Sequence, residues 1–303
     1  MSARSPNVLR RHCRVSPKPR FAAASKKRPQ GSTIDVVAVR FATWNVGHRF
    51  GDHERRLEAI VETLRNEQPD IVCLQEVWAM EGGDDQVDLI GNALGWHSAR
   101  TPTIFWRGQS FGNAVISQWP LLGSETVALF DANGERTPRS ALFASVDSPF
   151  GAIMSVSTHF EHRFDRSATR VAQAEQLCAQ IIDRRPDPET AFPLVVGGDL
   201  NAVPDSDEIR ALTGRRHPPH KGLVLTDAWE MSGDDSPGHT WSSRNPHLAD
   251  ATWPNRRLDY VMVSWPRPKG VGVPINTRLI GTQPCGGIVP SDHFGVISDL
   301  RTS

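Results

Sequence analysis

Acidic, amide and histidine side chains stand at or beside the ends of several apolar segments of this 303-residue chain. In the stretch 194–201 a short apolar run and two glycines lead to Asp199 and Asn201. Residues two apart in an extended chain face the same side, so both side chains would point into one space. A carboxylate and a carboxamide placed there can orient a water molecule and hold an oxyanion. A glycine turn with a capping asparagine is the structural alternative.

The same arrangement recurs along the chain. Charged and amide groups beside buried strands cost free energy unless they are paired or lie at a water-filled rim. Repeated occurrences of one chemical type therefore favour a shared site over separate structural groups. The residues concerned are Asn45, Glu76, His159, Asp199 with Asn201, Asp259, and Asp292 with His293.

The donor types in this set narrow the chemistry. Glu76, Asp292 and Asn45 offer oxygen atoms, which Mg²⁺ prefers, and the sequence has no cysteine–histidine cluster with zinc spacing. Mg²⁺ held by carboxylates suits hydrolysis of a phosphate ester, because the metal neutralises phosphate charge while a carboxylate aligns the attacking water. We therefore expect Mg²⁺, or Mn²⁺ in its place, as the cofactor.

Hydrophobic periodicity predicts the elements that position these residues. Many strands follow one another directly, which favours two stacked sheets with helices outside rather than an alternating parallel sheet. One domain over 36–303 is expected. The predicted helices are 53–68, 86–94, 166–185 and a short one after Ser206, and the predicted strands are 36–44, 71–74, 113–117, 125–130, 140–147, 152–158, 194–196, 258–263, 278–280 and 294–298.

The net charge of zero is a composite of two unlike parts. Residues 1–34 hold nine basic and no acidic side chains, so the remainder carries 25 basic against 34 acidic residues. We predict that residues 1–35 form a disordered basic extension. A passive tail or a misplaced start, a weak nucleic-acid arm and an organellar transit peptide all fit its composition. The acidic remainder must meet any polyanion locally or through bound cations.

The four cysteines lie far apart without a C-x-x-C pair. Cys73 and Cys178 fall in apolar patterns and are expected to be buried thiols in a reducing compartment. No apolar run approaches the length of a membrane span, and no apolar core of a secretory signal is present near the N-terminus. We expect a cytoplasmic monomer without a membrane span.

Six short motifs make a specific resemblance because they occur in order along the chain. Together they resemble the endonuclease/exonuclease/phosphatase superfamily over about residues 38–300. That group includes abasic-site endonucleases, pancreatic-type deoxyribonucleases, bacterial sphingomyelinases and inositol polyphosphate 5-phosphatases. The resemblance implies a four-layer α/β sandwich with two mostly antiparallel sheets. The motifs are Ala42–Val46, Asp70–Val77, Ser157–His159, Gly197–Asn201, Arg257–Val261 and Ser291–His293.

The resemblance also implies metal-site roles. Asn45 and Glu76 would help to hold the divalent metal, with Asp292 nearby. One departure concerns the residue two after Asn45, which is acidic in abasic-site endonucleases and is Gly47 here. This departure argues against an abasic-site enzyme and leaves the completion of the metal shell open.

Catalytic roles follow from the same resemblance. Asp199 would orient or deprotonate the attacking water, and Asn201 would hydrogen-bond the phosphate. His293 would contact the scissile phosphate, with Asp259 accepting its other ring N–H. His159 would donate to a phosphoryl or leaving-group oxygen.

Two further residues are predicted to bind substrate. Arg139 precedes a predicted strand and would contact phosphate, although a surface arginine fits the same position. Asn113 would line the cleft. A nucleic-acid phosphodiester such as DNA is the first expected substrate, followed by a phospholipid or sphingomyelin-type phosphodiester and a small phosphate ester.

Two alternatives come from other functional classes. Gly108–Gly112 matches the G-x-S-x-G pattern of serine hydrolases, and Ser110, Asp259 and His293 follow in the order that such enzymes use. That pattern needs a helix directly after the serine, and a strand-like segment follows instead. A non-catalytic binding module on the same fold is the other alternative, although every expected polar position is occupied.

Overall fold

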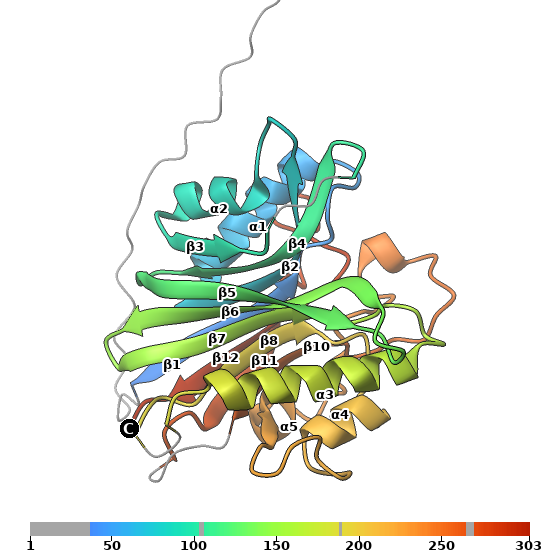
Figure 1. The fold of residues 1–303 in the computed structure, drawn as a ribbon. Helices are drawn as coiled ribbons and strands as arrows, with labels where there is room; N and C mark the ends of the chain where they lie inside the picture. Colours follow the sequence, from blue (N-terminus) through green and yellow to red (C-terminus); the bar gives the residue numbers. More distant parts are fainter. Residues whose placement is uncertain (1–36, 103–105, 188–189, 265–269) are drawn as a thin grey trace, which may run out of the picture. The chain divides into compact units, whose positions relative to one another are not determined.

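Two six-stranded sheets lie face to face in the computed structural model, with helices on their outer faces (Figure 1). The described residues all belong to one compact unit. The predicted extension over residues 1–35 lies outside them and stays a prediction. The structure describes residues 37–102, 106–187, 190–264 and 270–303.

The first sheet has the order β11-β12-β1-β2-β4-β3. Only β1 and β2 pair in parallel, and helix α1 connects them, whereas the other neighbours are antiparallel. Its elements are β1 (Ala38–Asn45), α1 (His53–Glu67), β2 (Ile71–Met80), α2 (Gln86–Leu94), β3 (His97–Arg100), β4 (Gln109–Ser117), β11 (Pro274–Ile280) and β12 (Gly295–Arg301).

The second sheet has the order β5-β6-β7-β8-β10-β9. It repeats the plan of the first, because β7 and β8 are its parallel pair and helix α3 connects them. Its elements and the remaining short helices are β5 (Leu121–Phe130), β6 (Arg136–Ser148), β7 (Gly151–His159), α3 (Ser167–Arg184), β8 (Val195–Asp199), α4 (Asp207–Leu212), β9 (Leu225–Asp227), α5 (Ala228–Ser232), η1 (Pro246–Leu248) and β10 (Asp259–Ser264).

Alternation along the central strands divides the apolar side chains among three layers of core. In β8, Val195 packs between the two sheets, whereas Val196 packs on the outer face together with Leu177 of α3. In β1, Phe41 likewise faces the other sheet and Ala42 faces the side of α1. This alternation follows from the two-residue period of a strand. The predicted four-layer sandwich is therefore confirmed.

Gly197 allows the sheets to approach closely beside the polar strand ends. A β-carbon at this position would lie 2.7 Å from Cys73 Cβ and 3.0 Å from Thr43 Cβ, both in the facing sheet. Gly198 has a similar constraint within its own sheet, because a β-carbon there would lie 2.7 Å from the Thr158 carbonyl oxygen. The two glycines of the motif thus set the spacing of the strands that carry Asp199.

The element predictions hold for the long segments and for the short helix after Ser206, which is α4, and fail for some other short segments. Strand β2 does not end before Glu76 as expected; it continues to Met80 through an irregularity in its pairing with β4 between Leu74 and Val77. Strands β3 and β9 and helix α5 were not predicted. These segments have three to five residues, too few to show a period.

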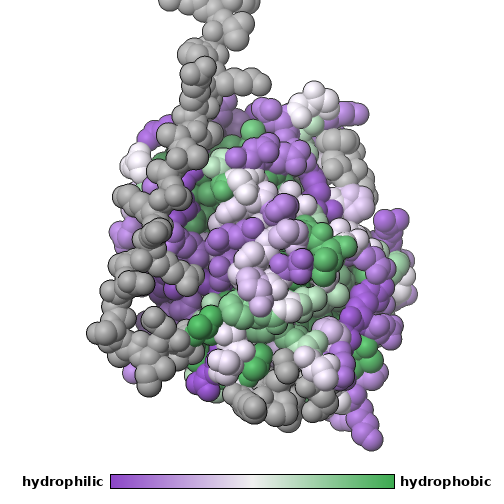
Figure 2. Space-filling view, turned by 90° about the vertical axis from the view of Figure 1, so that its left-hand side faces the viewer, coloured by the Kyte–Doolittle hydropathy of each residue, from purple (hydrophilic) through white to green (hydrophobic). Residues whose placement is uncertain are grey.

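The surface carries the expected mixture of residue types. On the face seen in Figure 2, hydrophilic residues surround smaller hydrophobic clusters, as is ordinary for folded proteins. Within the described part of the chain, no helix has both the length and the apolar character needed to cross a membrane. Cys73 and Cys178 are free and buried, as expected from their apolar patterns.

Candidate active site

The two parallel strand pairs end at the same site. Strand β1 ends at Asn45, and β2 reaches Glu76 one residue past the partner of Asn45. In the other sheet His159, at the end of β7, pairs in register with Asp199, at the end of β8. Asp259 begins the antiparallel strand β10 opposite Asp199. Parallel pairing places the carboxyl ends of both strands at one edge, so distant segments supply neighbouring side chains.

Asp199 lies at the centre of this site and is 1% exposed. Its Oδ2 accepts a hydrogen bond of 3.0 Å from Asn45 Nδ2, and its Oδ1 accepts one of 3.0 Å from the Asn201 backbone N–H. Burial and the nearby Asp259 carboxylate raise the pKa of Asp199 to about 7, although His293 and these hydrogen bonds favour its charged form. A carboxylate with such a pKa can accept a proton near neutral pH.

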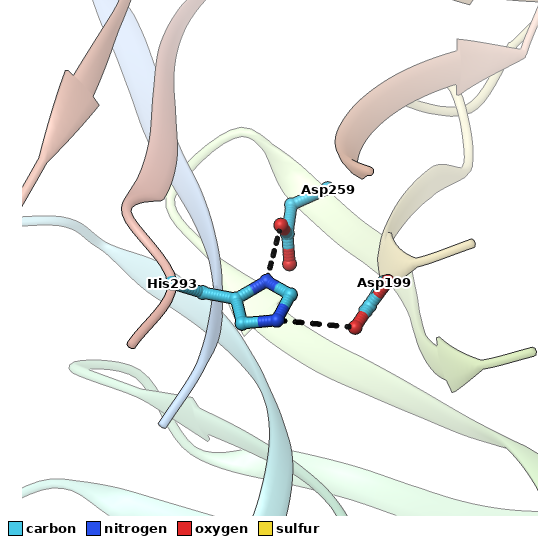
Figure 3. A group of neighbouring side chains, drawn as sticks. All are labelled: Asp199, Asp259 and His293. Atoms are coloured by element: carbon cyan, nitrogen blue, oxygen red, sulfur yellow. Dashed lines mark hydrogen bonds and ion pairs between the residues drawn. The ribbon is translucent and has the colours of Figure 1, made fainter. Parts of the chain in front are cut away.

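His293 forms a close pair with Asp259. The His293 Nδ1 lies 2.8 Å from Asp259 Oδ2, and the ring stands between this carboxylate and Asp199, whose Oδ2 lies 3.9 Å from Nε2 (Figure 3). Burial opposes the charge on the ring, but the carboxylates of Asp259, Asp199 and Asp292 outweigh burial and hold the pKa of His293 well above its usual value. These carboxylates therefore favour the imidazolium form of His293.

His159 has the opposite protonation state. Its Nε2 lies 3.5 Å from Asp199 Oδ2. Burial lowers the pKa of His159 well below its usual value, and the positive charges of Arg139, His293 and His162 lower it further. The site thus holds a charged and a neutral imidazole on either side of the Asp199 carboxylate. The charged ring can donate a proton, and the neutral ring can form a hydrogen bond.

Glu76 lies on the more exposed part of the site. Its backbone adopts a φ of 57° in the irregular part of β2, a conformation uncommon for a residue other than glycine. Its Oε1 accepts a 3.2 Å hydrogen bond from Asn45 Nδ2, and its Oε2 lies 4.0 Å from His48 Nε2. The Asn45 Oδ1 accepts from the Gly47 N–H, so the Asn45 nitrogen, rather than its oxygen, faces the carboxylates.

Asp292 occupies the space beside Gly47. A β-carbon on Gly47 would overlap Asp292 Oδ1, and Gly47 has a φ of 56°. Gly47 stands where abasic-site endonucleases have an acidic residue. The Asp292 carboxylate excludes any side chain at this position. Ser291 Oγ lies 3.2 Å from the same Asp292 oxygen.

Glu76 and Asp292 carry the donor type that a divalent cation prefers, and both carboxylates act on the same Arg56 guanidinium. Asp199, Asp259 and His293 are close enough to hold an ion, because their ligand atoms lie within 4.8 Å of one another. A protonated imidazole, however, has no lone pair to offer a metal. Carboxylate oxygens at a partly exposed rim are donors that Mg²⁺ accepts while it keeps several waters.

Buried polar residues that the sequence motifs do not include hold the loops of this site. The Arg56 guanidinium is 2% exposed and donates to the backbone oxygens of Val46, Gly47 and Pro290, which lie beside Asn45 and Ser291. Burial lowers the pKa of Arg56 to about 10, and Asp292 and Glu76 oppose this shift. An arginine inside the predicted helix 53–68 gave no signal of this role.

Two hydroxyl groups act similarly on the strands. Ser291 Oγ donates a 2.7 Å hydrogen bond to the Asn45 carbonyl oxygen. Thr240 Oγ1 accepts hydrogen bonds from the Leu258 and Asp259 backbone N–H groups, 3.0 and 3.2 Å long. Ser291 lies inside one of the ordered motifs, whereas nothing in the sequence around Thr240 connected it to Asp259 in particular.

The two predicted substrate-binding residues lie in different settings. Burial lowers the pKa of Arg139, while Asp199, Glu161 and Glu76 oppose this shift, so its guanidinium lies within the field of the site carboxylates. Asn113 Nδ2 instead donates a 2.9 Å hydrogen bond to the Ser140 carbonyl oxygen, which joins β4 to β6 across the sheets. A substrate contact for either residue stays a prediction.

Asn201 lies beside Asp199 as expected from the spacing. It has a φ of 49°, and its Nδ2 donates one hydrogen bond of 3.2 Å to the Phe160 carbonyl oxygen, which leaves its second N–H for a ligand.

The serine-hydrolase alternative is wrong in its geometry. Ser110 is buried inside β4, and no helix follows it, so no nucleophile elbow is formed.

Known proteins are similar to this chain over most of its length. The model of the Endonuclease/Exonuclease/phosphatase family matches residues 42–293. The chain is 24% identical over 270 residues to tyrosyl-DNA phosphodiesterase 2 of Xenopus laevis and 26% identical over 184 residues to Protein angel of Drosophila melanogaster. These alignments cover 86% and 56% of this chain, but only 66% and 49% of the relatives' own length.

Solved structures show the same fold. A humanized D. rerio TDP2 superimposes with a TM-score of 0.66 at 20% identity, covering 87% of this chain and 99% of that one. The human Nocturnin catalytic domain gives a TM-score of 0.64 at 22% identity, covering 86% and 93%. The family match confirms the resemblance seen in the ordered motifs. The chain belongs to the endonuclease/exonuclease/phosphatase family.

Proposed function

We propose that this protein is a Mg²⁺-dependent hydrolase of phosphodiester bonds in nucleic acid. The observation that carries the proposal is the buried Asp199, whose pKa is raised to about 7, between a charged and a neutral histidine and beside the Glu76 and Asp292 oxygens. Relatives support the nucleic-acid substrate. One is named tyrosyl-DNA phosphodiesterase 2, and the D. rerio TDP2 structure was solved with a single-strand DNA product.

Asp199 is the proton acceptor for the attacking water in this proposal. Its Oδ1 is held by the Asn201 N–H and its Oδ2 by Asn45, so the carboxylate has a fixed direction. A general base with a pKa near the working pH combines a useful fraction of the unprotonated form with sufficient basicity. This accounts for a carboxylate that is buried rather than solvated.

His293 stabilises negative charge that develops on the phosphoryl oxygens. Its Nδ1–H donates to Asp259, which fixes the ring and leaves the Nε2–H directed into the site. A pre-oriented cationic donor of this kind stabilises a transition state that carries more negative charge than the substrate. His159 supplies a neutral N–H donor for the same group or for the leaving-group oxygen.

Glu76 and Asp292 would hold the divalent cation, and Asn45 lies beside Glu76 through its 3.2 Å hydrogen bond. When bound there, Mg²⁺ supplies positive charge that offsets the negative charge of the phosphate. Asn45 connects the two parts of the site, because its Nδ2 donates to both Glu76 and Asp199. Movement of either carboxylate therefore changes the position of the other.

Turnover on a panel of phosphate esters tests this proposal. The panel comprises plasmid DNA, single-stranded DNA, abasic duplex, RNA, sphingomyelin and bis-p-nitrophenyl phosphate, each with Mg²⁺ and with EDTA. We expect cleavage of nucleic acid that requires Mg²⁺ and is lost in Asp199→Asn. Asp147→Asn is the matched control. Asp147 is exposed and lies at the end of β6 that is opposite to the site.

Cleavage of sphingomyelin without cleavage of any nucleic acid would overturn the substrate assignment and leave the site intact. Full activity in EDTA would overturn the metal dependence. Equal losses in Asp199→Asn and Asp147→Asn would overturn the site itself.

We further propose that the enzyme acts as a monomer in the cytoplasm. Support for a monomer comes from the origin of the site residues, all of which belong to one chain. Support for a reducing compartment comes from the free, buried thiols of Cys73 and Cys178. Sedimentation of the purified chain and imaging of a tagged protein in its host test these two points.

A further inference from the structure

We propose that Asn245 is a positioning residue for the reaction, because it holds the backbone segment that carries His293. The inference rests on the proposed function and deepens it, since it identifies a residue on which the placement of a catalytic group depends. Asn245 lies in the long loop between α5 and β10, outside the six ordered motifs, and its side chain is completely buried.

The two ends of the Asn245 carboxamide make different contacts. Its Nδ2 donates a 2.8 Å hydrogen bond to the Ser291 carbonyl oxygen, 46 residues further along the chain. Its Oδ1 accepts a 3.0 Å hydrogen bond from the His247 backbone N–H and thereby caps the short helix η1. A cap needs an oxygen acceptor alone, so the hydrogen bond from Nδ2 serves another purpose.

Ser291 is the residue through which Asn245 reaches His293. It is completely buried, and its Oγ donates a 2.7 Å hydrogen bond to the Asn45 carbonyl oxygen. The His293 backbone N–H in turn donates to the same Oγ over 3.3 Å. Because the peptide unit after Ser291 is planar, a hydrogen bond that fixes its carbonyl oxygen also fixes the direction of the chain toward His293.

The same loop holds the residue that follows His293. The Thr240 carbonyl oxygen accepts a 2.8 Å hydrogen bond from the Phe294 backbone N–H. Asn245 and Thr240 therefore fix the backbone before and after His293, and both contacts come from one stretch of six residues.

This stretch also holds the partner of His293. Asp259 begins β10 in the second sheet, whereas His293 leads into β12 in the first. Thr240 Oγ1 accepts a 3.2 Å hydrogen bond from the Asp259 backbone N–H. The stretch from Thr240 to Asn245 is thus bonded to both sides of the His293–Asp259 pair, which comes from two different sheets (Figure 3).

A neighbouring contact supports the start of the segment but leaves its centre to Asn245. His247 Nε2 lies 3.0 Å from the Val289 carbonyl oxygen, and Nε2 is the donor because a carbonyl oxygen can only accept. The His247 ring also meets the Phe50 ring edge-on, with 5.0 Å between centroids. His247 therefore restrains Val289, whereas Asn245 binds the Ser291 carbonyl oxygen.

His293 lies between two carboxylates, so a small displacement of its ring changes both contacts. Its Nδ1 lies 2.8 Å from Asp259 Oδ2, and its Nε2 lies 3.9 Å from Asp199 Oδ2. Misplacement of a catalytic group by about 1 Å can lower a rate by about 10²-fold. Loss of the Asn245 contact should therefore lower kcat with little effect on KM, because it weakens a contact to the transition state.

A serine at position 245 separates positioning from capping. Serine caps helices about as well as asparagine, but its side chain is one bond shorter, so its hydroxyl does not reach the Ser291 carbonyl oxygen. In the full-length chain with saturating Mg²⁺ and a labelled single-stranded oligonucleotide, we expect Asn245→Ser to lower kcat about 10–100-fold. KM should change by less than about threefold.

A second variant and a control accompany this measurement. Asn245→Asp keeps the shape of the side chain and the cap, but an ionised carboxylate has no N–H to donate, so the same loss of kcat is expected. Asn276→Ser is the control and should leave kcat unchanged. Asn276 is exposed in β11 and donates a 3.0 Å hydrogen bond to Asp299, which pairs near the start of β1 rather than at its end.

The His293 ring gives a measurement that does not depend on turnover. Its Nδ1–H donates to a buried carboxylate, and such a proton gives a proton NMR signal at low field, which His293→Ala identifies by removing it. We expect this signal to move to higher field in Asn245→Ser and to stay in place in Asn276→Ser. A residue that only capped η1 would leave the signal unmoved in Asn245→Ser, because serine still caps.

A double variant tests whether the effect passes through His293. We expect the kcat of Asn245→Ser with His293→Ala to equal that of His293→Ala alone, because both changes act on one group. Loss by the same factor with and without His293 would overturn the positioning role.

Wild-type kcat together with an unmoved His293 signal in Asn245→Ser and Asn245→Asp would also overturn it. Failure of the proposed function gives a different pattern. The wild type would then cleave no nucleic acid, while the His293 signal would still move in Asn245→Ser.

Discussion

Each sheet contains one parallel strand pair, β1 with β2 and β7 with β8, and both pairs end at the candidate active site. Both have a connecting helix on the outer face. The first pair supplies Asn45 and Glu76, and the second supplies His159 and Asp199. The same backbone device thus brings two different sets of side chains to one place, which allows their surroundings to be compared directly.

The two sets differ in their contact with water. The Glu76 side chain is 27% exposed, whereas that of Asp199 is 2% exposed. Removal from water raises the pKa of Asp199 and lowers that of His159, so the second pair supplies groups tuned for proton transfer. The first pair keeps a carboxylate that solvent and cations can reach. The proposed function thus assigns cation binding to the first set and acid–base chemistry to the second.

The largest expected effect is on turnover when the buried set is changed. We expect Asp199→Asn and His293→Ala each to lower turnover by about 10²–10⁴-fold, as the loss of a positioned acid or base does. The measurement is the initial rate on a labelled single-stranded oligonucleotide with saturating Mg²⁺. Near-wild-type rates in both variants would contradict the assignment.

The exposed set should affect cation binding instead. We expect Glu76→Gln to weaken Mn²⁺ binding by about 10–100-fold, comparable with other changes around metal ligands, and Asp199→Asn to change it much less. Electron paramagnetic resonance of free Mn²⁺ during a titration measures both. Stronger weakening in Asp199→Asn than in Glu76→Gln would reverse the comparison.

The pH dependence should report the buried set. Asp199 is protonated below about pH 7 and then cannot accept a proton, so kcat/KM should fall about tenfold per pH unit below that value. Asp259 raises the pKa of both Asp199 and His293. Asp259→Asn should therefore move both limbs of the profile to lower pH, and limbs that stay in place would contradict this coupling.

Protonation of Asp199 should stabilise the fold although it lowers activity. The folded-state pKa of about 7 lies above the ordinary 3.8, so the folded chain retains a proton that the unfolded chain releases. The resulting stability is complete below pH 3.8 and is lost as the pH rises through 7. Asp199→Asn should thus melt about 5 °C higher than the wild type at pH 8, roughly 2 kcal/mol, and this gain should vanish below pH 4. Calorimetry at both pH values measures the difference.

The smallest effect concerns the spacing of the two sheets. Gly197→Ala would place a β-carbon against Cys73 and Thr43, and we expect it to lower the free energy of unfolding by about 1–3 kcal/mol. Gly123 in β5 has open space around it, so Gly123→Ala is the matched control. Urea denaturation of both variants decides the question, and equal midpoints would show that the sheets can separate without cost.

The long elements and the ordered motifs were predictable because their signals are local. Helix α3 repeats its apolar residues over 18 positions, and the alternation in the central strands predicts two buried faces. The irregularity at Glu76 was not predictable, since it depends on the pairing of β2 with β4. Short strands such as β9 exist because a neighbouring strand supplies hydrogen bonds.

The candidate site was predictable in its members but not in its supports. Acids, amides and histidines at strand ends carry a chemical signal in the sequence. Arg56 carries none, because it acts through backbone groups of segments distant in sequence. The protonation states of His159 and His293 also depend on burial and on neighbours that only the folded chain brings together.

One measurement tests the central claim most directly: the initial rate of cleavage of a single labelled oligonucleotide as a function of free Mg²⁺, for the wild type, Glu76→Gln and Asp199→Asn. We expect no cleavage without Mg²⁺, a Glu76→Gln curve displaced to higher Mg²⁺, and an Asp199→Asn rate that stays low at every concentration. Recovery of the Asp199→Asn rate by added Mg²⁺, or cleavage in EDTA, would contradict it.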